Sequence, residues 1–308
     1  MANFTKTLGQ VGFGMAVVTS LMPPWFLCIF GQLYVQSGNP DAKEEREMAL
    51  ARWVTMLTCL CWRAALSVCW WVRQDLEGVP EMRAKIGNSG RPVCVIGNHS
   101  SFMDIFVSVA AFPLRTVSVC KMIVSSHVFD MPLIGRICST MQHLAVPFKD
   151  TSATSTNFEV DKEALVVVME NYEAHLKAGK ACAWFPEGQV NKGDCSKLQT
   201  FRAGGMGIAV RSDVEIWSMA FVGHAVTWPK RALIGGYPAH MGGRIKLVCE
   251  SSKAWLSEQC KDQDERAQSL FLANTTQKMI QADVDEFVEK GYKAGDNTGK
   301  GGDAKKLE

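Results

Sequence analysis

The stretch Arg91–Asp104, "RPVCVIGNHSSFMD", joins a short apolar run to an Asn-His pair and a following aspartate. The run Val93–Gly97 has the length and composition of a buried strand, and "FMDIFVSVAAF" continues with a helical pattern. Between them, Asn98–Ser101 are of the polar types that cap helix N-termini. Open α/β sheets form their sites at the carboxyl ends of strands, where His99 would stand. The stretch therefore predicts an α/β fold with a candidate site at this junction.

The spacing of His99 and Asp104 restricts how the two side chains can meet. On one straight helix, positions five residues apart point about 140° away from each other. The pair can touch if His99 stands in the turn and Asp104 rises from the helix. Asp104 would then accept a hydrogen bond from one ring nitrogen and leave the other nitrogen free as a base. The alternative is a capping histidine beside a solvated helix carboxylate.

Apolar runs typical of strands alternate with helical patterns over residues 76–250. The strand-like runs are Val93–Gly97, Thr116–Cys120, Leu144–Phe148, Ala181–Phe185, Val214–Val222 and Ile245–Cys249. The helical patterns are Ser101–Ala111, Pro132–Met141 and Asp161–Lys177. This alternation predicts an α/β domain in which a sheet is layered with helices. After it, we expect a polar helical segment at residues 251–292 and a disordered tail at residues 293–308.

The N-terminal part of the chain is apolar over two long stretches. No charged residue occurs from Thr7 to Pro40, and Trp53–Val72 carries only Arg63. A membrane helix needs about 20 apolar residues, so the first stretch is long enough, although Pro23-Pro24 would kink or divide it. We therefore predict a membrane-embedded helical pair in residues 1–75, either spanning the bilayer or entering one leaflet. The alternative is two buried helices of a soluble protein.

Charge and cysteine content restrict the class of protein. The net charge is only +2, which gives no argument for nucleic-acid binding. The eleven cysteines show no spacing typical of disulfide frameworks or zinc sites, so we expect a reducing compartment and no metal. The last four residues, Lys305–Glu308, form a K-K-x-x ending of the kind that directs membrane proteins back to the endoplasmic reticulum. That ending predicts an endoplasmic reticulum membrane protein with a cytosol-facing catalytic domain.

A second junction lies in "ACAWFPEGQVNKGD", Ala181–Asp194. Its strand-like run ends in Phe185-Pro186-Glu187-Gly188, again at a carboxyl end. Proline fixes such a turn, glycine allows close backbone approach, and the glutamate is presented to whatever binds there. Since a surface turn could have the same composition, this motif gains meaning only together with the first.

A nucleophile motif is missing from the sequence. The pattern G-x-S-x-G, which presents the serine of many hydrolases, does not occur, and nothing marks one of the cysteines as a nucleophile. A His-Asp pair without its own nucleophile can instead activate a hydroxyl group that the substrate brings.

Together the motifs at the two junctions, Asn98–Asp104 and Phe185–Gly188, resemble two conserved sequence boxes of the membrane glycerolipid acyltransferases of the lysophosphatidic acid acyltransferase type. The segment Asn98–Asp104, "NHSSFMD", matches that family's N-H-x-x-x-x-D box, and Phe185–Gly188 matches its F-P-E-G box. Lys121 with "MPLIG" at Met131–Gly135 is similar to the segment that leads into the second block. Phe201–Gly205, "FRAGG", resembles the F-K-x-G that follows F-P-E-G.

The resemblance, over residues 93–222, implies a mixed central sheet flanked by helices and transfer of an acyl group from acyl-coenzyme A to a lysoglycerolipid. The acceptor would be 1-acyl-sn-glycerol-3-phosphate, which gives phosphatidic acid in phospholipid biosynthesis. His99 would be the general base and Asp104 its orienting partner, with no covalent enzyme intermediate, metal or cofactor. The resemblance further implies a substrate-binding set of Asn98, Phe185, Pro186, Glu187 and Gly188, joined by the cations Lys149 and Arg202.

This sequence departs from the family at its basic positions. The family's F-P-E-G-T-R arginine is replaced by Val190, and the second block offers Lys149, displaced by a residue, where an arginine is usual. We expect Lys149 first, then Arg202, with Lys192 as a further candidate, to bind an acceptor phosphate. Three alternatives remain open: another lysophospholipid or glycerol 3-phosphate as acceptor, an inactive membrane lipid-binding protein, and a soluble hydrolase.

Overall fold

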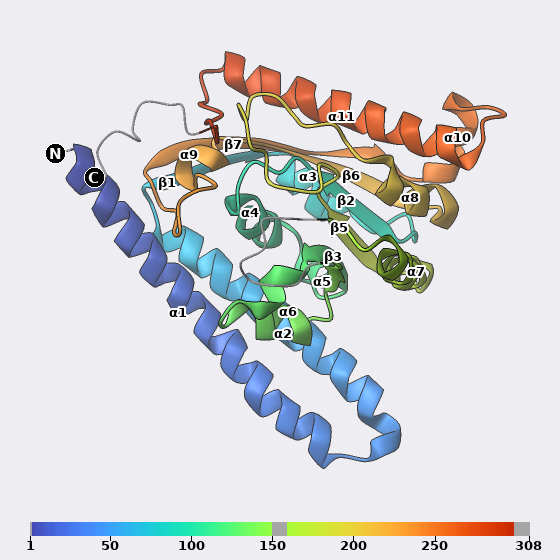
Figure 1. Ribbon diagram of the computed structural model, residues 1–308, viewed down its shortest axis with the longest axis horizontal. Coiled ribbons are helices and arrows are strands. Elements are labelled where there is room, and N and C mark those ends of the chain that lie inside the picture. The colour runs from blue at the N-terminus through green and yellow to red at the C-terminus, as the bar shows by residue number, and fades with distance from the viewer. Residues whose placement is uncertain (1, 150–158, 299–308) are drawn as a thin grey trace.

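The computed structural model describes residues 2–149 and 159–298, and within these ranges seven strands form one sheet (Figure 1). Across the sheet the strands run in the order β1-β7-β6-β2-β5-β3-β4. Their bounds are β1 Val72–Glu77, β2 Val93–Gly97, β3 Cys120–Ser125, β4 Leu144–Val146, β5 Ala181–Trp184, β6 Glu215–Val222 and β7 Ala239–Cys249. All neighbours are parallel except β6 and β7, so the sheet is mixed, as predicted.

Helices cover both faces of this sheet. The longer ones are α1 Ala2–Ser37, α2 Lys43–Val68, α4 Met103–Ala111, α7 Lys162–Lys177, α10 Ser252–Gln259 and α11 Glu265–Glu289. The shorter ones are α3 Val79–Lys85, α5 Leu114–Val117, α6 Ile134–Thr140, α8 Met206–Ser212 and α9 His224–Thr227. Single 3-10 turns are η1 Pro40–Ala42, η2 Ser126–Asp130 and η3 Ala203–Gly205. Figure 1 shows α11 along one face and α4 with α1 and α2 on the other.

Strand β2 divides the hydrophobic core into two layers. Val93 and Val95 belong to the cluster that contains α1, α2, α4 and α6 side chains, whereas Cys94 and Ile96 belong to the cluster under α8 and α11. This alternation follows from the two-residue period of a strand. Because β2 is buried on both faces, its sequence is a continuous apolar run, which is why the run could be recognised.

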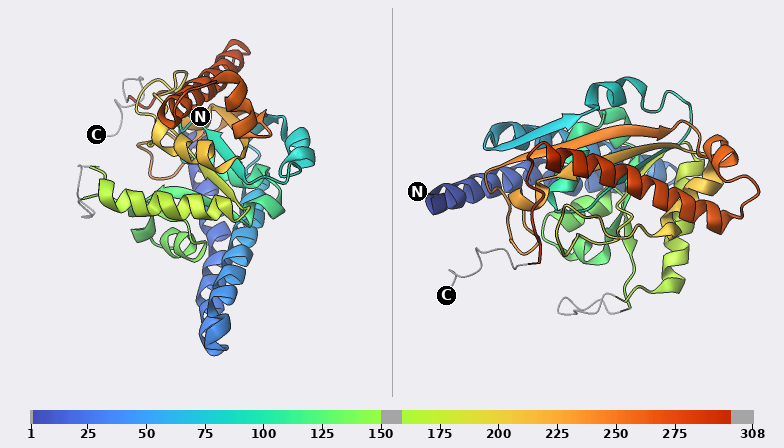
Figure 2. Two further views of the ribbon diagram at one scale, coloured as in Figure 1. Left: turned by 90° about the vertical axis from the view of Figure 1, so that its right-hand side faces the viewer. Right: turned by 90° about the horizontal axis from the view of Figure 1, so that it is seen from above.

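The N-terminal helices α1 and α2 pack side by side and extend beyond the rest of the molecule (Figure 2). Gly31 allows a close approach, since a methyl group there would lie 2.2 Å from the Leu50 side chain. Pro23 and Pro24 lie inside α1, which continues through them as one helix rather than two arms. In the described part of the chain, α1 alone, over Thr5–Ser37, is long and apolar enough to cross a membrane. Embedding of the pair stays a prediction.

One predicted strand is wrong in its bounds, and one observed strand was not predicted. The strand expected at Thr116–Cys120 begins only at Cys120, because α5 occupies the preceding residues. Strand β1 was not predicted and crosses the expected boundary at residue 75. It lies at the edge of the sheet and exposes alternate polar side chains, so it contains no apolar run.

The predicted disordered tail begins too early. Asn297 is buried, and its side-chain amide donates to the carbonyl oxygens of Ser100 (2.9 Å) and Asn191 (2.8 Å). Its backbone nitrogen donates to the Gly193 carbonyl oxygen (2.9 Å). These partners hold residues 293–298 against the loops that follow β2 and β5, which sequence composition could not indicate. The K-K-x-x ending, Lys305–Glu308, lies outside the described residues.

Candidate active site

The structure brings His99 and Asp104 together at the carboxyl end of β2. His99 stands in the loop after the strand, and Asp104 lies in the first turn of α4. His99 Nδ1 donates to Asp104 Oδ2 across 3.0 Å, because a carboxylate can only accept. The histidine side chain is 12% exposed, so Nε2 is the ring nitrogen that remains for a substrate. This is the arrangement that a general base requires.

Asp104 is fully buried and is surrounded by donors. The backbone nitrogens of Ser100 (2.6 Å) and Ser101 (2.8 Å) donate to Oδ2, which also accepts from His99. Oδ1 accepts from His224 Nδ1 (2.6 Å) and from the Ser100 hydroxyl (3.2 Å). Burial alone would raise the pKa of Asp104, but the bonds from His224 and His99 lower it to about 2. Asp104 is therefore an anion at neutral pH.

The Phe185–Gly188 turn supports His99 rather than facing open solvent. The Phe185 ring stacks on the imidazole with ring centroids 4.1 Å apart and planes inclined by 10°. The buried Glu187 carboxylate accepts from the backbone nitrogens of His99 (2.8 Å) and Gln199 (3.1 Å). On the other side, the His99 carbonyl oxygen accepts from the Asn191 nitrogen (2.7 Å). The turn and the segment after it therefore hold both the ring and the backbone of His99.

The parallel pairing of β2 and β5 explains why the two boxes meet. Ile96 is the register partner of Trp184, so both strands end at the same edge of the sheet. Pro186 and Gly188 complete the turn after β5, in which the Gly188 nitrogen donates to the Phe185 carbonyl oxygen (2.9 Å). Gly188 has a φ of +72°, which favours glycine at this place.

Glu187 has an unusual ionisation state. Burial raises the pKa of its carboxyl group to about 7, and the negative charge of Asp104 adds to the effect. The two backbone bonds from His99 and Gln199 only partly offset the burial. Both carboxylate oxygens bind backbone amides, and the role of Glu187 in substrate binding stays a prediction.

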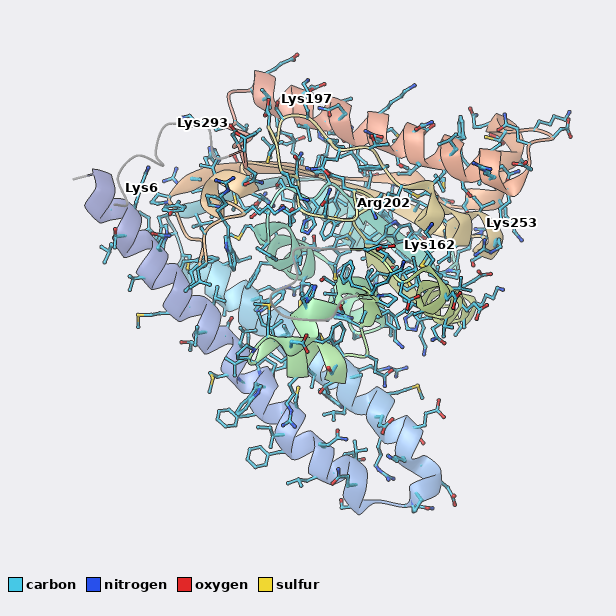
Figure 3. The ribbon with its side chains drawn as sticks, viewed as in Figure 1. Lys6, Lys162, Lys197, Arg202, Lys253 and Lys293 are labelled. Atoms are coloured by element: carbon cyan, nitrogen blue, oxygen red, sulfur yellow. The ribbon has the colours of Figure 1, made fainter. Side chains whose placement is uncertain are left out.

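Of the three predicted phosphate ligands, the first two choices, Lys149 and Arg202, lie in different places. Arg202 is exposed and lies against the turn, since a methyl group at Gly188 would meet its guanidinium at 2.9 Å (Figure 3). Lys149 follows β4 at the sheet edge and forms an ion pair with Glu159 at 2.5 Å. Strands β5 and β3 separate β4 from β2, so Arg202 is the better placed of the two cations.

Asn98 has a structural role in this arrangement. Its side chain is buried, accepts from the Phe221 nitrogen (2.7 Å) and donates to the Phe221 carbonyl oxygen (3.0 Å). The amide thereby extends the pairing of β2 with β6 beyond Gly97. Because the amide already binds the backbone of Phe221, contact of Asn98 with substrate stays a prediction.

The sequence analysis missed one functional candidate, His224. This residue begins α9 directly after β6, and its imidazole binds Asp104 on the side away from His99. Strand β6 is parallel to β2 and ends at the same edge. The signal was therefore present as a histidine two residues beyond a predicted buried strand, but nothing in its local sequence distinguished it.

Residues 74–222 match the protein-family model described as Acyltransferase. The chain carries an acyltransferase domain. The match begins inside β1 and ends with the last residue of β6, so the domain contains His99, Asp104, the Phe185–Gly188 turn and Arg202. His224 lies two residues beyond the match. The resemblance predicted from the two boxes is thereby confirmed.

Several curated proteins are similar to this chain in sequence. The 1-acyl-sn-glycerol-3-phosphate acyltransferase LPAT1, chloroplastic, of Arabidopsis thaliana is 23% identical over 205 residues, which cover 63% of this chain and 51% of the relative. The 1-acyl-sn-glycerol-3-phosphate acyltransferase of Cocos nucifera is 27% identical over 138 residues, which cover 45% of this chain and 40% of the relative. The chain thus spans about half the length of the curated relatives it matches.

A solved structure shares the fold of this chain. It is the 1-acyl-sn-glycerophosphate (LPA) acyltransferase, PlsC, from Thermotoga maritima, with a TM-score of 0.60 and 15% sequence identity. The alignment covers 94% of this chain and 98% of that one, so the N-terminal helices and the sheet have counterparts within one structure.

Proposed function

We propose that this acyltransferase transfers an acyl group from acyl-coenzyme A to the free hydroxyl of a lysoglycerolipid, with 1-acyl-sn-glycerol-3-phosphate as the acceptor and phosphatidic acid as the product. The observation that carries the proposal is the His99–Asp104 contact of 3.0 Å at the edge of the sheet, beside the Phe185–Gly188 turn. The acceptor is suggested by the names of the sequence relatives.

The geometry supports a single general-base step. The acceptor hydroxyl oxygen would form a bond to the thioester carbonyl carbon while its proton passes to Nε2 of His99. The carbon–sulfur bond would then break, and the coenzyme A thiolate would leave and recover that proton as the free thiol. Asp104 would hold Nδ1 as the donor and stabilise the imidazolium between these events. None of these bond-forming, bond-breaking and proton-transfer steps needs a metal or a cofactor.

The proposed acceptor is a lipid, and the apolar surface of α1 suits access from a membrane. Exposed side chains on this helix include Met15, Phe30 and Leu33. We therefore propose that the acyltransferase is held at a membrane by α1 and α2. An endoplasmic reticulum membrane with a cytosol-facing site remains part of the proposal, while two of the relatives are named as chloroplast proteins.

The direct test is release of free thiol from acyl-coenzyme A by the purified full chain in detergent. Acceptors would be lysophosphatidic acid, other lysophospholipids and glycerol 3-phosphate, each assayed in parallel. We expect release with lysophosphatidic acid and a loss of about 10²- to 10⁴-fold in kcat for His99→Ala, since that range is typical for a general base.

His240→Ala is the matched control, because His240 is an exposed histidine paired with Asp75. It should retain parental turnover. A folded His99→Ala variant with near-normal turnover would contradict the mechanism. Thiol release with another lysophospholipid alone would assign a different acceptor, and no release with any acceptor would favour a lipid-binding protein.

A further inference from the structure

Asp104 is shared by two histidines that approach different oxygens of the carboxylate. His99 binds Oδ2 at 3.0 Å, and His224 binds Oδ1 at 2.6 Å. The two imidazoles differ in access, since the His99 side chain is 12% exposed and that of His224 is fully buried. His224 therefore cannot act on substrate directly, and any contribution it makes passes through Asp104.

The turn after β6 places His224 beside Asp104. Gly223 has a φ of +85°, and a methyl group on it would lie 3.1 Å from the His240 carbonyl oxygen. A larger residue would strain this turn, which returns the chain toward the sheet edge. The His224 ring then packs on Phe221, with ring centroids 4.6 Å apart and planes inclined by 25°.

Both nitrogens of His224 have partners. Nδ1 must donate to Asp104, because the carboxylate is an anion that only accepts. Nε2 lies 2.9 Å from Oε1 of Gln74 on the edge strand β1. A side-chain amide can meet an imidazole nitrogen either as donor or as acceptor, so Gln74 fixes the ring in either case.

The His224 bond restricts the rotation of the carboxylate. Among the described residues, Oδ2 accepts from two backbone amides and from His99, whereas Oδ1 accepts from His224 and, over a longer distance, from the Ser100 hydroxyl. Without the His224 donor, a buried anionic oxygen would lose its shortest partner. The carboxylate plane, and with it the direction of the Nδ1–H of His99, would then be less well defined.

We propose that His224 is a positioning residue that orients Asp104 and thereby aims His99 at the acceptor hydroxyl. This inference rests on the proposed function, in which His99 is the base. It assigns a role in turnover to a residue that lies outside the matched acyltransferase domain and 120 positions from Asp104 in the sequence.

Two amide substitutions separate this role from a purely structural one. In His224→Asn the side-chain amide nitrogen takes the place of Nδ1 and can still donate to Asp104. In His224→Gln the amide group reaches the place of Nε2 and can replace the contact with Gln74 instead. His224→Leu removes both contacts while keeping an apolar body.

The assay is thiol release with acyl-coenzyme A and lysophosphatidic acid, on full-length variants whose thermal unfolding in detergent has been recorded. We expect His224→Leu to lose about 10- to 100-fold in kcat, as for a lost bond to a buried charge, with KM for both substrates changed less than about two-fold. His224→Asn should recover most of the lost kcat, and His224→Gln should recover little.

The comparison of the two amides decides the inference. If His224→Gln equals or exceeds His224→Asn in kcat, or if folded His224→Leu turns over like the parent, the positioning role is overturned. Inactivity of the parent, or full activity of His99→Ala, would instead overturn the proposed function, so the two failures are distinguishable.

Discussion

At the scale of single residues, the site holds two buried carboxyl groups whose pKa values are shifted in opposite directions. Asp104 has two histidine partners that lower its pKa to about 2, whereas Glu187 has only backbone partners and burial raises its pKa to about 7. Neighbouring acids whose pKa values are moved apart in this way can serve different purposes at one pH. Here Asp104 supplies a fixed negative charge, and the two oxygens of Glu187 accept from the backbone nitrogens of His99 and Gln199.

The raised pKa of Glu187 predicts a dependence of stability on pH. A carboxyl group whose pKa is higher in the folded than in the unfolded protein contributes to the free energy of unfolding. For Glu187 this contribution is complete below pH 4.5, the ordinary pKa of a glutamate, and it is lost as pH rises through about 7. Because one pKa unit corresponds to about 1.4 kcal/mol, the loss amounts to roughly 3 kcal/mol. Glu187→Gln cannot ionise, so this part of the pH dependence should disappear.

The measurement is chemical unfolding in detergent at pH 5 and pH 8 for the parent and for Glu187→Gln. The parent should lose more free energy of unfolding between the two pH values than the variant does. Equal losses in both proteins would show that Glu187 ionises in the folded protein as it does in water.

At the scale of secondary-structure elements, strand order decides which cation can meet the acceptor phosphate. Strand β5 lies beside β2 and leads into the turn that Arg202 contacts. Strand β4 lies three strands from β2, about 14 Å at the usual spacing, and leads to Lys149. The sequence favoured Lys149 because the strand before it was expected to end at the same edge of the sheet as the strand before His99. It could not indicate how far apart the two strands lie along that edge.

Arg202→Met should therefore raise KM for lysophosphatidic acid by about 10-fold or more, since a charge-assisted bond to phosphate is lost. The KM for acyl-coenzyme A should change much less. Lys149→Met is the matched control, and we expect its kinetics with both substrates to stay near parental. A larger effect from Lys149→Met would restore the order predicted from the sequence, and no effect from either would place the phosphate elsewhere.

At the scale of the whole molecule, the projecting helices carry the exposed apolar surface. The large apolar side chains of α1 that are exposed are Leu8, Val11, Met15, Val18, Phe26, Phe30, Leu33 and Tyr34. Buried residues of the same helix, such as Phe13 and Val17, belong to the core under the sheet. One face of α1 thus packs against the α/β domain, and the other face is apolar and exposed.

This division predicts that the protein stays with membranes through an alkaline carbonate wash. Leu33→Glu should weaken the retention, because burying a charge in hydrocarbon is costly. Leu270→Glu is the matched control on α11, where Leu270 is also exposed but lies on the opposite side of the sheet (Figure 1). Full extraction of the parent by carbonate, or equal retention of both variants, would show that α1 does not hold the protein at the membrane.

The sequence by itself determined the parts of the site that depend on neighbouring residues. His99 and Asp104 meet within five residues because a buried strand, a polar turn and a helix follow one another directly. The Phe185–Gly188 turn was recognisable for the same reason, since a buried parallel strand gives a continuous apolar run that ends at the functional edge.

Only the tertiary structure decided the contacts that join distant segments. His224 reaches Asp104 across 120 residues and Gln74 across 150, through pairings of β6 and β1 that local patterns do not specify. The same holds for Asn98, whose amide binds the backbone of Phe221, and for Glu187, whose carboxylate binds the backbone of His99 and Gln199. The type of a side chain limits what it can bind, but the order of strands in the sheet determines which partners it meets.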